Sequence, residues 1–204
     1  DAKIGNRLKV GINSVTSRST QNGVSTQSTG SDNIGSVNGG GDDVVSLAFR
    51  FAPDVGRFDE DGNFSQNTVG DNIENPWAVA TQITNQTKTD NSRTNVYADF
   101  EVLSGLNFKT TLGYRTQNST EGYFKPQTFV LSAGGGFIES VKRTNFLNEN
   151  YLTYTKPIGN GNLTATAGHS YQKSTTEGLE AGARGLLTDV FSYYNLEAGL
   201  IDQR

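Results

Sequence analysis

Residues 94–115 carry the pattern that decides the fold, and they read TNVYADFEVLSGLNFKTTLGYR. Apolar and polar side chains alternate along residues 94–103 and again along residues 106–116, which is the period of a β-strand with two different faces. Ser104-Gly105 separates the two runs and supplies the small residues of a tight turn. The pattern therefore predicts an antiparallel hairpin.

The two faces of this predicted hairpin carry different chemistry. Alternate positions from Val96 to Val102 are apolar, and so are most alternate positions from Leu106 to Tyr114. The positions between them point the other way and hold polar or charged side chains, among them Tyr97, Asp99, Glu101, Lys109 and Arg115. A sheet of this kind separates an apolar environment from an aqueous one.

Three further segments, near residues 7–15, 147–156 and 163–172, show the same alternation. A turn at residues 157–162 joins the last two, and it contains glycine and proline. The single histidine, His169, falls on the apolar face of the last strand. The sequence therefore predicts an all-β antiparallel meander of about five strands.

The predicted connections differ sharply in length. Two of them are tight turns, whereas long loops would cover residues 16–93, 117–146 and 173–204. Loops longer than about 12–15 residues are uncommon in compact soluble domains. Short turns at one end of the strands and long loops at the other are typical of transmembrane β-barrels, whose long loops are extracellular. Helical spacing predicts short helices inside these loops, near residues 44–51 and 186–196.

The bulk composition excludes several classes of protein. With 17 basic and 21 acidic residues the net charge is −4, and no long run of like charges occurs, so nucleic acid is not an expected partner. No cysteine and one histidine leave no thiolate or histidine-rich metal site. The sequence has no run of about 18 apolar residues, which excludes a transmembrane helix but not barrel strands of alternating character.

Several short motifs follow one another along the chain. They are, in order, FAP (51–53), FDEDGNF (58–64), NPWA (75–78), YADFEVL (97–103), SGL (104–106), FKTTLGY (108–114), ENYLTY (149–154) and AGHSYQ (167–172). In this order and spacing, the chain resembles the middle of the barrel of the SusC/RagA-type TonB-dependent outer-membrane transporters.

The resemblance implies a plugged barrel in the bacterial outer membrane that imports glycans or peptides. Such an importer would be embedded in outer-membrane lipid, energised by a TonB complex and paired with a SusD-like surface lipoprotein. Residues 1–204 contain no plug domain, and about five strands are too few to close a large barrel. We therefore expect an incomplete barrel segment that forms lumen wall and outer vestibule, with TonB contacted through the missing plug portion.

Two sets of residues are candidates for function. The first set would line the lumen and comprises Tyr97, Asp99, Glu101, Lys109 and Arg115. The second set consists of loop aromatics expected to be exposed, namely Trp77, Tyr123, Phe124 and Tyr193. Aromatic faces suit sugar rings or peptide side chains of a cargo, and the same rings could equally anchor loops to one another.

Two alternative functions stay open from the sequence. A soluble carbohydrate-binding β-sandwich would need a second sheet over the face that holds Val96 and Phe100. An extracellular glycosidase would need two convergent carboxylates, and Asp99 and Glu101 have a suitable spacing of roughly 6.6 Å. Every strand with alternate acids offers that spacing, so we expect no catalytic residue and no enzyme activity.

Two loop motifs could suggest bound ions. Asp59, Asp61 and Asn63 place oxygen ligands at alternate positions, but the glycine comes early for a calcium loop and the terminal glutamate is missing. An Asp-Gly turn is the simpler interpretation. Gly134–Gly136 lacks the Lys-Ser/Thr of a phosphate-binding loop. No metal and no cofactor are therefore expected.

Overall fold

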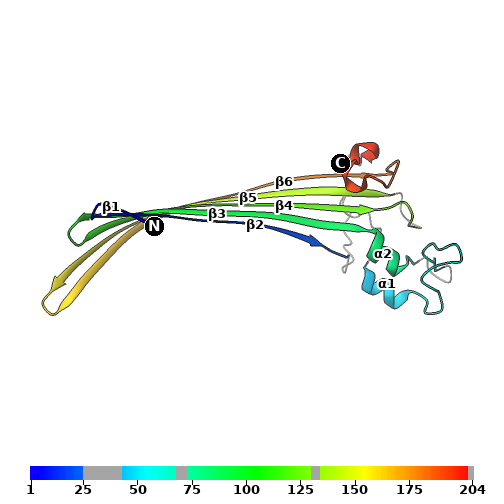
Figure 1. Ribbon diagram of the computed structural model, residues 1–204, viewed down its shortest axis with the longest axis horizontal. Coiled ribbons are helices and arrows are strands. Elements are labelled where there is room, and N and C mark those ends of the chain that lie inside the picture. Colours follow the sequence, from blue (N-terminus) through cyan, green and yellow to red (C-terminus); the bar gives the residue numbers. More distant parts are fainter. Residues whose placement is uncertain (25–42, 68–72, 130–133, 202–204) are drawn as a thin grey trace. The chain divides into compact units, whose positions relative to one another are not determined.

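The computed structural model describes residues 1–24, 43–67, 73–129 and 134–201 (Figure 1). These residues form an antiparallel sheet in which every strand lies beside its sequence neighbour, in the order β1-β2-β3-β4-β5-β6-β7. The strands are β1 (Ala2–Ile4), β2 (Leu8–Asn22), β3 (Thr84–Leu103), β4 (Leu106–Lys125), β5 (Gly135–Ile158), β6 (Gly161–Arg184) and β7 (Leu200–Ile201). The predicted all-β meander is therefore confirmed.

The chain divides into two compact units, and the long strands contribute to both. Unit 1 consists of Asp1–Ser19, Thr89–Ser119 and Val141–Glu177. Unit 2 consists of Thr20–Lys88, Thr120–Ser140 and Gly178–Arg204. Each unit is described separately below.

Unit 1 contains only strands and tight turns in its described residues. Two glycines make these turns possible, because Gly105 and Gly159 adopt φ angles of 81° and 59°, which side chains disfavour. They occupy the two short joints that the sequence predicted, between β3 and β4 and between β5 and β6. The hairpin turns of the predicted meander are thus confirmed.

Paired residues across the strands define the two faces of unit 1. From β2 to β5, residues that face each other on neighbouring strands both have even numbers or both have odd numbers. Examples are Ser14–Thr94 (3.0 Å), Thr89–Ser119 (3.3 Å) and Thr155 N–H to Gly105 O (2.7 Å). Between β5 and β6 an odd-numbered residue faces an even-numbered one, as in Thr153–Thr166 (3.3 Å). Alternate side chains therefore line one continuous face. This "apolar face" includes Leu8, Val10, Ile12, Val96, Ala98, Phe100, Leu106, Phe108, Leu112, Tyr114, Leu152, Tyr154, Leu163, Ala165, Ala167 and Tyr171.

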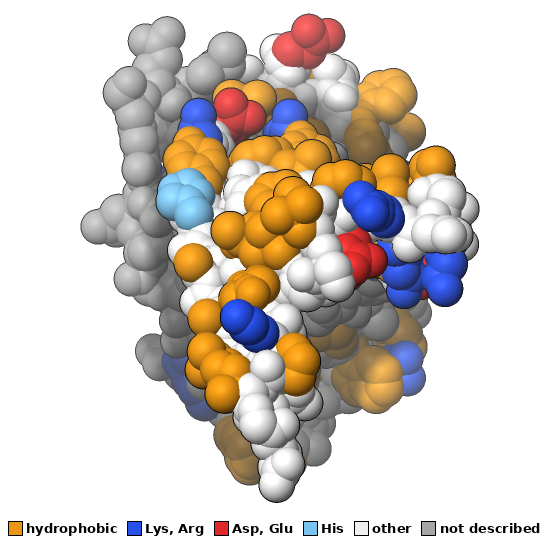
Figure 2. All heavy atoms as spheres, turned by 90° about the vertical axis from the view of Figure 1, so that its left-hand side faces the viewer, with side chains coloured by type: hydrophobic (Ala, Val, Ile, Leu, Met, Phe, Trp, Pro, Cys, Tyr) orange, Lys and Arg blue, Asp and Glu red, His pale blue; other side chains and the backbone are white. Residues whose placement is uncertain are grey.

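The apolar face of unit 1 is uncovered. Val96 and Phe100 are both 41% exposed, and Ile12 is 69% exposed. Figure 2 shows hydrophobic side chains gathered at the molecular surface. The described residues form one sheet and supply no second sheet above this face, so the β-sandwich alternative is wrong for this part of the chain.

Two short helices lie side by side in unit 2. Helix α1 (Val44–Arg50) begins after Asp43, whose carboxylate accepts a hydrogen bond from Val45 N–H (3.0 Å). Helix α2 (Pro76–Gln82) begins after Asn75, whose side chain caps Trp77 N–H (2.9 Å). Helices this short are not stable alone in water, so tertiary packing must hold them. Their cluster buries Leu47, Ala78, Val79 and Phe129.

A second hydrophobic cluster in unit 2 joins the ends of the long strands to the C-terminal segment. It buries Phe124, Ala183, Leu186 and Tyr193. Tyr193 belongs to the 3-10 helix η1 (Ser192–Tyr194), which is followed by η2 (Leu196–Ala198). A Cβ atom at Gly122 would collide with the Tyr193 ring, so this close packing requires glycine on β4.

The predicted element bounds need correction. Strands β2, β3, β4, β5 and β6 all extend into the predicted loops 16–93, 117–146 and 173–204. These extensions carry polar residues on both faces, so they lack the alternation that marked the rest of each strand. Gly135 and Gly136 fall within the predicted loop 117–146 but belong to β5.

The helix predictions were partly right. Helix α1 confirms the segment near residues 44–51, whereas residues 186–196 contain no α-helix but the short η1 turn and the start of η2. Helix α2 was not predicted, although its NPWA start provides an Asn cap and a Pro in the first turn. Among the described residues, no helix has the length and apolar character needed to cross a membrane.

Candidate functional site

The face of unit 1 opposite the apolar face is polar, and it places Tyr97 between two cations. The ammonium groups of Lys109 and Lys9 lie 5.6 and 5.8 Å from the centroid of the Tyr97 ring. Lys9 also pairs with Asp1 at 3.3 Å. Gly11 lies beneath the ring, where a Cβ atom would collide with it. The structure thus brings together two of the predicted lumen residues, Tyr97 and Lys109.

Asp99 and Glu101 lie together in a shallow cavity of about 300 Å³ on unit 1. Three cationic side chains, those of Lys3, Arg7 and Lys9, line the same cavity. Asp99 and Glu101 therefore lie on a shallow surface cavity whose described lining carries both charge signs.

Arg115 lies apart from the other predicted lumen residues. It lines a second cavity of about 290 Å³ on unit 1, together with Arg93, Asn95 and Gln172. The polar face therefore carries patches of both charge signs instead of one convergent catalytic group. Such a surface can contact a passing polar solute without covalent chemistry.

The predicted exposed aromatics are mostly buried, which corrects the sequence-based interpretation. The exposed fractions are 4% for Tyr123, 3% for Phe124 and 6% for Tyr193. Tyr123 and Phe124 belong to β4. The Tyr123 ring stacks on Phe137 with centroids 5.4 Å apart. Trp77 is 50% exposed and is the exception. In the structure Phe124 and Tyr193 join the end of β4 to the C-terminal segment, whereas Tyr123 packs against β5.

Trp77 already has a partner on one face of its ring. The Arg57 guanidinium carbon lies 3.8 Å from the centroid of the Trp77 ring, which is a close cation–π contact. A sugar ring stacking on Trp77 would therefore have to use the other face or displace Arg57. This contact reduces the area that Trp77 can offer to a ligand.

Tyr193 and Tyr194 form a hydroxyl pair at the strand ends of unit 2. Their hydroxyl oxygens are 3.0 Å apart, and the Tyr193 hydroxyl also donates to Gln86 Oε1 at 3.4 Å. Burial, together with the hydrogen bond to Tyr194, raises the pKa of Tyr193 to about 12. Tyr193 therefore stays protonated at physiological pH and acts as a polar anchor for η1.

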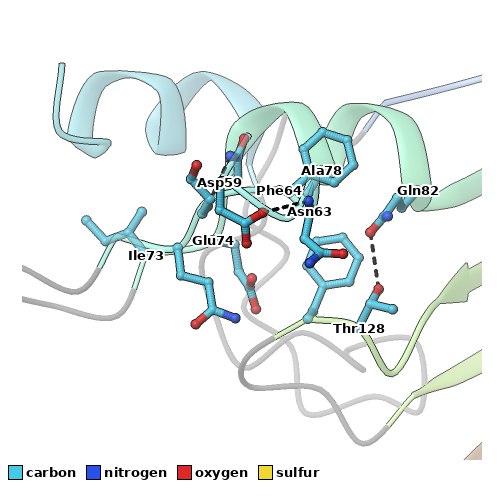
Figure 3. A pocket seen from close by; sticks show the side chains of 13 residues that line it. Asp59, Asn63, Phe64, Ile73, Glu74, Ala78, Gln82 and Thr128 are labelled. Atoms are coloured by element: carbon cyan, nitrogen blue, oxygen red, sulfur yellow. Dashed lines mark hydrogen bonds between the residues drawn. The ribbon is translucent and has the colours of Figure 1, made fainter. Parts of the chain in front are cut away.

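A cavity in unit 2 was not predicted from the sequence (Figure 3). Its volume is about 590 Å³, and we call it the acidic pocket. Its lining consists of Asp59, Gly62, Asn63, Phe64, Ser65, Gln66, Ile73, Glu74, Asn75, Ala78, Gln82, Thr128 and Phe129. The walls come from segments 59–82 and 128–129, which are far apart in sequence, so no local motif indicates the pocket.

The Asp59 turn forms one wall of the acidic pocket. Asp59 Oδ1 accepts hydrogen bonds from the backbone N–H groups of Asp61 (3.1 Å) and Asn63 (2.8 Å), and Gly62 has a φ angle of 82°. This is the geometry of an Asp-Gly turn. Within the described part of the chain, no group of three potential acidic or histidine metal ligands occurs. The turn interpretation therefore fits better than the calcium loop.

Hydrogen bonds also fix other side chains around the acidic pocket. The Thr128 hydroxyl donates to Gln82 Oε1 at 3.1 Å, as Figure 3 shows. Asn75 is buried and its amide donates to the carbonyls of Arg57 and Ser65, both at 3.1 Å. These bonds hold polar side chains of the pocket wall in defined positions.

Comparison with known proteins gives the context of these features. No family model matches the chain. The TonB-dependent receptor P3 of Formosa agariphila is 46% identical over 204 residues, which is 98% of this chain and 20% of that receptor. The TonB-dependent receptors P26 and P39 of the same organism are each 30% identical, over 68% and 74% of this chain and 15% and 14% of their own lengths.

The chain spans about a fifth of the length of the first of these relatives. All three are TonB-dependent receptors, and the first match covers nearly every residue of this chain. The exposed apolar face and the polar face of unit 1 agree with a transmembrane barrel strand pattern. The chain therefore belongs to the TonB-dependent receptors, which are proteins of the bacterial outer membrane.

Proposed function

We propose that this chain forms barrel wall and extracellular vestibule in an outer-membrane importer of glycans or peptides. The observation that carries the proposal is the uncovered apolar face of unit 1. Burial of a large apolar side chain stabilises a protein by about 1.5–3 kcal/mol. A sheet that leaves such side chains from five neighbouring strands in water forgoes this stabilisation, whereas lipid hydrocarbon would supply it.

The outward surface changes character at a defined level on β2 and β3. Below this level it carries Ile12 and Val96. Directly above it, outward side chains bond to each other across the strands, as Ser14–Thr94 (3.0 Å), Thr16–Ser92 (3.5 Å) and Arg18–Asp90 (2.6 and 2.9 Å). Charged side chains are costly in the bilayer centre. We place the outer limit of the hydrocarbon layer between these two sets of residues.

The polar face of unit 1 would line the lumen. Its candidates are Tyr97, Asp99, Glu101, Lys109 and Arg115. Cationic and anionic groups both line cavities on this face, so it would present hydrogen-bonding and charged groups to a polar solute moving through the barrel. We assign covalent chemistry to none of these residues, and we propose that the protein is a transporter and not an enzyme.

Unpaired strand edges support the view that further strands lie beside this segment. Strand β7 pairs with β6 only at Ala183 and Arg184, and β1 pairs with β2 only from Leu8 to Val10. Unpaired backbone groups are unfavourable in lipid, so barrels close their sheets. We propose that neighbouring strands of a larger barrel occupy both edges.

The partners follow from the SusC/RagA resemblance and are part of the proposal. A SusD-like surface lipoprotein would cover the vestibule formed by unit 2, and a TonB complex would act through a plug portion outside residues 1–204. The relatives are TonB-dependent receptors by name, which supports TonB as the energy source.

The test is cysteine labelling in the complete receptor in intact outer membranes. Single cysteines at Ala98 and Phe100 should react slowly with a membrane-impermeant maleimide, because lipid would cover both positions. Cysteines at Tyr97 and Asp99, on the polar face of the same strand, should react faster when the lumen is open to water. Equal reactivity at all four positions would contradict the proposal.

A further inference from the structure

We propose that the acidic pocket of unit 2 binds an uncharged, hydroxyl-rich ligand of the oligosaccharide class and rejects sulfated or otherwise anionic glycans. This inference rests on the proposed function, because the ligand would be cargo that reaches the vestibule of an importer. It selects one cargo class where the resemblance leaves glycans and peptides open. The argument uses the pocket's size, its hydrogen-bonding groups and its charge.

The size of the acidic pocket suits a ligand of a few sugar rings. Its volume of about 590 Å³ falls within the range of about 300–1,000 Å³ that ligand pockets occupy. Two cavities on unit 1 are about half as large, at about 300 and 290 Å³. The acidic pocket is therefore the best candidate for enclosing a ligand among the cavities described.

The hydrogen-bonding groups of the acidic pocket match hydroxyl groups. Each sugar hydroxyl both donates and accepts, so it pairs with carboxylates as a donor and with amides in either role. The lining includes the carboxylate of Asp59 and the amides of Asn63, Gln66 and Gln82. Thr128 donates to Gln82 Oε1, which leaves the Gln82 amide N–H groups as donors.

Apolar surfaces complete the wall of the acidic pocket. Phe64 and Phe129 line it beside Ile73 and Ala78, and Phe129 is buried in the α1–α2 cluster. Aromatic rings held in place in this way can contact the C–H faces of sugar rings. Polar side chains outnumber apolar ones in the lining, which disfavours the larger apolar side chains of a peptide.

The charge of this region is one-sided. Among the lining residues that the structure describes there is no lysine, arginine or histidine. The described residues of 59–82 include the acids Asp59, Glu60, Asp61 and Glu74 and no basic residue. An anionic ligand would therefore be repelled here, whereas a neutral one would not.

The two basic residues closest to these segments in sequence are held against aromatic rings. Arg57 stacks on Trp77, with its guanidinium carbon 3.8 Å from the ring centroid. Lys125 is buried, with its ammonium 5.1 Å from the centroid of the Phe129 ring. Neither of them lines the pocket. The described lining of the acidic pocket therefore contains no cationic side chain that could receive a sulfate or carboxylate.

The test uses the complete receptor, purified in detergent, with a single reactive cysteine at Gln66. The probes are neutral oligosaccharide mixtures from laminarin, xylan and agarose, sulfated oligosaccharides from carrageenan, and a tryptic peptide mixture. We expect at least one neutral mixture to slow maleimide modification of this cysteine by about threefold or more, as partial occupancy of a pocket requires. No protection by any neutral mixture, or stronger protection by the sulfated or peptide probe, would overturn the proposal.

Charge variants at Gln82 sharpen the test. Gln82→Lys should shift the preference toward the sulfated probe by about three- to tenfold, and Gln82→Glu should shift it further toward neutral probes. Gln21→Lys, an exposed position of unit 2 outside the pocket lining, is the matched control and should leave the preference unchanged. An unchanged preference in Gln82→Lys would also overturn the proposal.

Failure of this proposal is separable from failure of the proposed function. If cysteines at Ala98 and Phe100 react more slowly than those at Tyr97 and Asp99, but no neutral probe protects Gln66→Cys, only the ligand assigned to the pocket is wrong. If the β3 pattern fails, the importer proposal is wrong whatever the pocket binds.

Discussion

Units 1 and 2 share the same strands but are stabilised in different ways. In unit 1 the described residues include no buried hydrophobic side chain, and the apolar side chains of its strands stand exposed. In unit 2 two clusters bury side chains such as Leu47, Val79 and Phe124. Unit 2 therefore has the core of a water-soluble protein, whereas unit 1 has a surface suited to hydrocarbon. The difference teaches that one chain is adapted here to two solvents.

The largest expected effect breaks the core of unit 2. Leu47→Ala removes a buried side chain from the α1–α2 cluster, and such truncations cost about 2–5 kcal/mol. Hydrogen exchange of the α1 and α2 amides should report this loss as easier local opening. Phe49→Ala on the same helix is the control, because Phe49 is 87% exposed and its removal should change little. Equal effects of both variants would show that α1 is not held by its buried face.

The second-largest effect tests whether lipid or water contacts the apolar face of unit 1. Ala98→Arg places a charge on the apolar face, and in the bilayer midplane this costs about 2–4 kcal/mol. Insertion and heat stability of the complete receptor in outer membranes should fall. Thr111→Arg, on the polar face of the neighbouring strand β4, is the control and should be tolerated. A variant Ala98→Arg that inserts as well as the control would argue that water covers the apolar face.

A smaller effect is expected where the strand ends meet the C-terminal segment. Gly122→Ala drives a Cβ atom into the Tyr193 ring, and overpacking of this kind costs about 1–3 kcal/mol. Proteolysis of residues 185–199 should become faster as η1 loosens. Gly178→Ala on β6 is the control, because no heavy atom lies within 4 Å of a Cβ built there. If η1 were not seated on β4, the two variants would behave alike.

The smallest effect depends on pH and concerns Glu121. Partial burial, and next the carboxylate of Glu139, raise the pKa of Glu121 above its usual value. In the pH range between the unfolded and folded pKa values the folded state binds more protons, so the stability of unit 2 rises as pH falls through this range. Glu121→Gln should stabilise unit 2 at neutral pH and lose that advantage in acid, as heat denaturation at several pH values would measure. An advantage of the same size at every pH would contradict this cause.

The sequence predicted those parts of the fold that have an apolar face. The alternation from Val96 to Tyr114 placed this part of β3, its turn and the start of β4 correctly, because apolar and polar positions alternate sharply there. The extensions of β2 and β3 beyond Ser14 and Thr94 were missed. They carry polar residues on both faces and are joined by side-chain bonds such as Arg18–Asp90, which leave no periodic signal.

The sequence predicted less of the candidate sites. Tyr97 and Lys109 were placed on one face by alternation, and the structure confirms that they are close together. Tyr123 and Tyr193 were expected to be exposed, but Tyr123 stacks on Phe137 of β5, and Tyr193 packs with Phe124 where the C-terminal segment meets the strand ends. The acidic pocket was missed, because its walls join residues 59–82 to residues 128–129 through tertiary packing. The one local indication was the run of acids without a base.

The central claim is that lipid hydrocarbon contacts the apolar face of unit 1. The most direct measurement is fluorescence of a bimane label, placed at successive residues 95–101 of the complete receptor in nanodiscs with brominated lipids. We predict strong quenching at Val96, Ala98 and Phe100, and weak quenching at the residues between them. Quenching without this alternation, or quenching confined to the odd-numbered residues, would contradict the account.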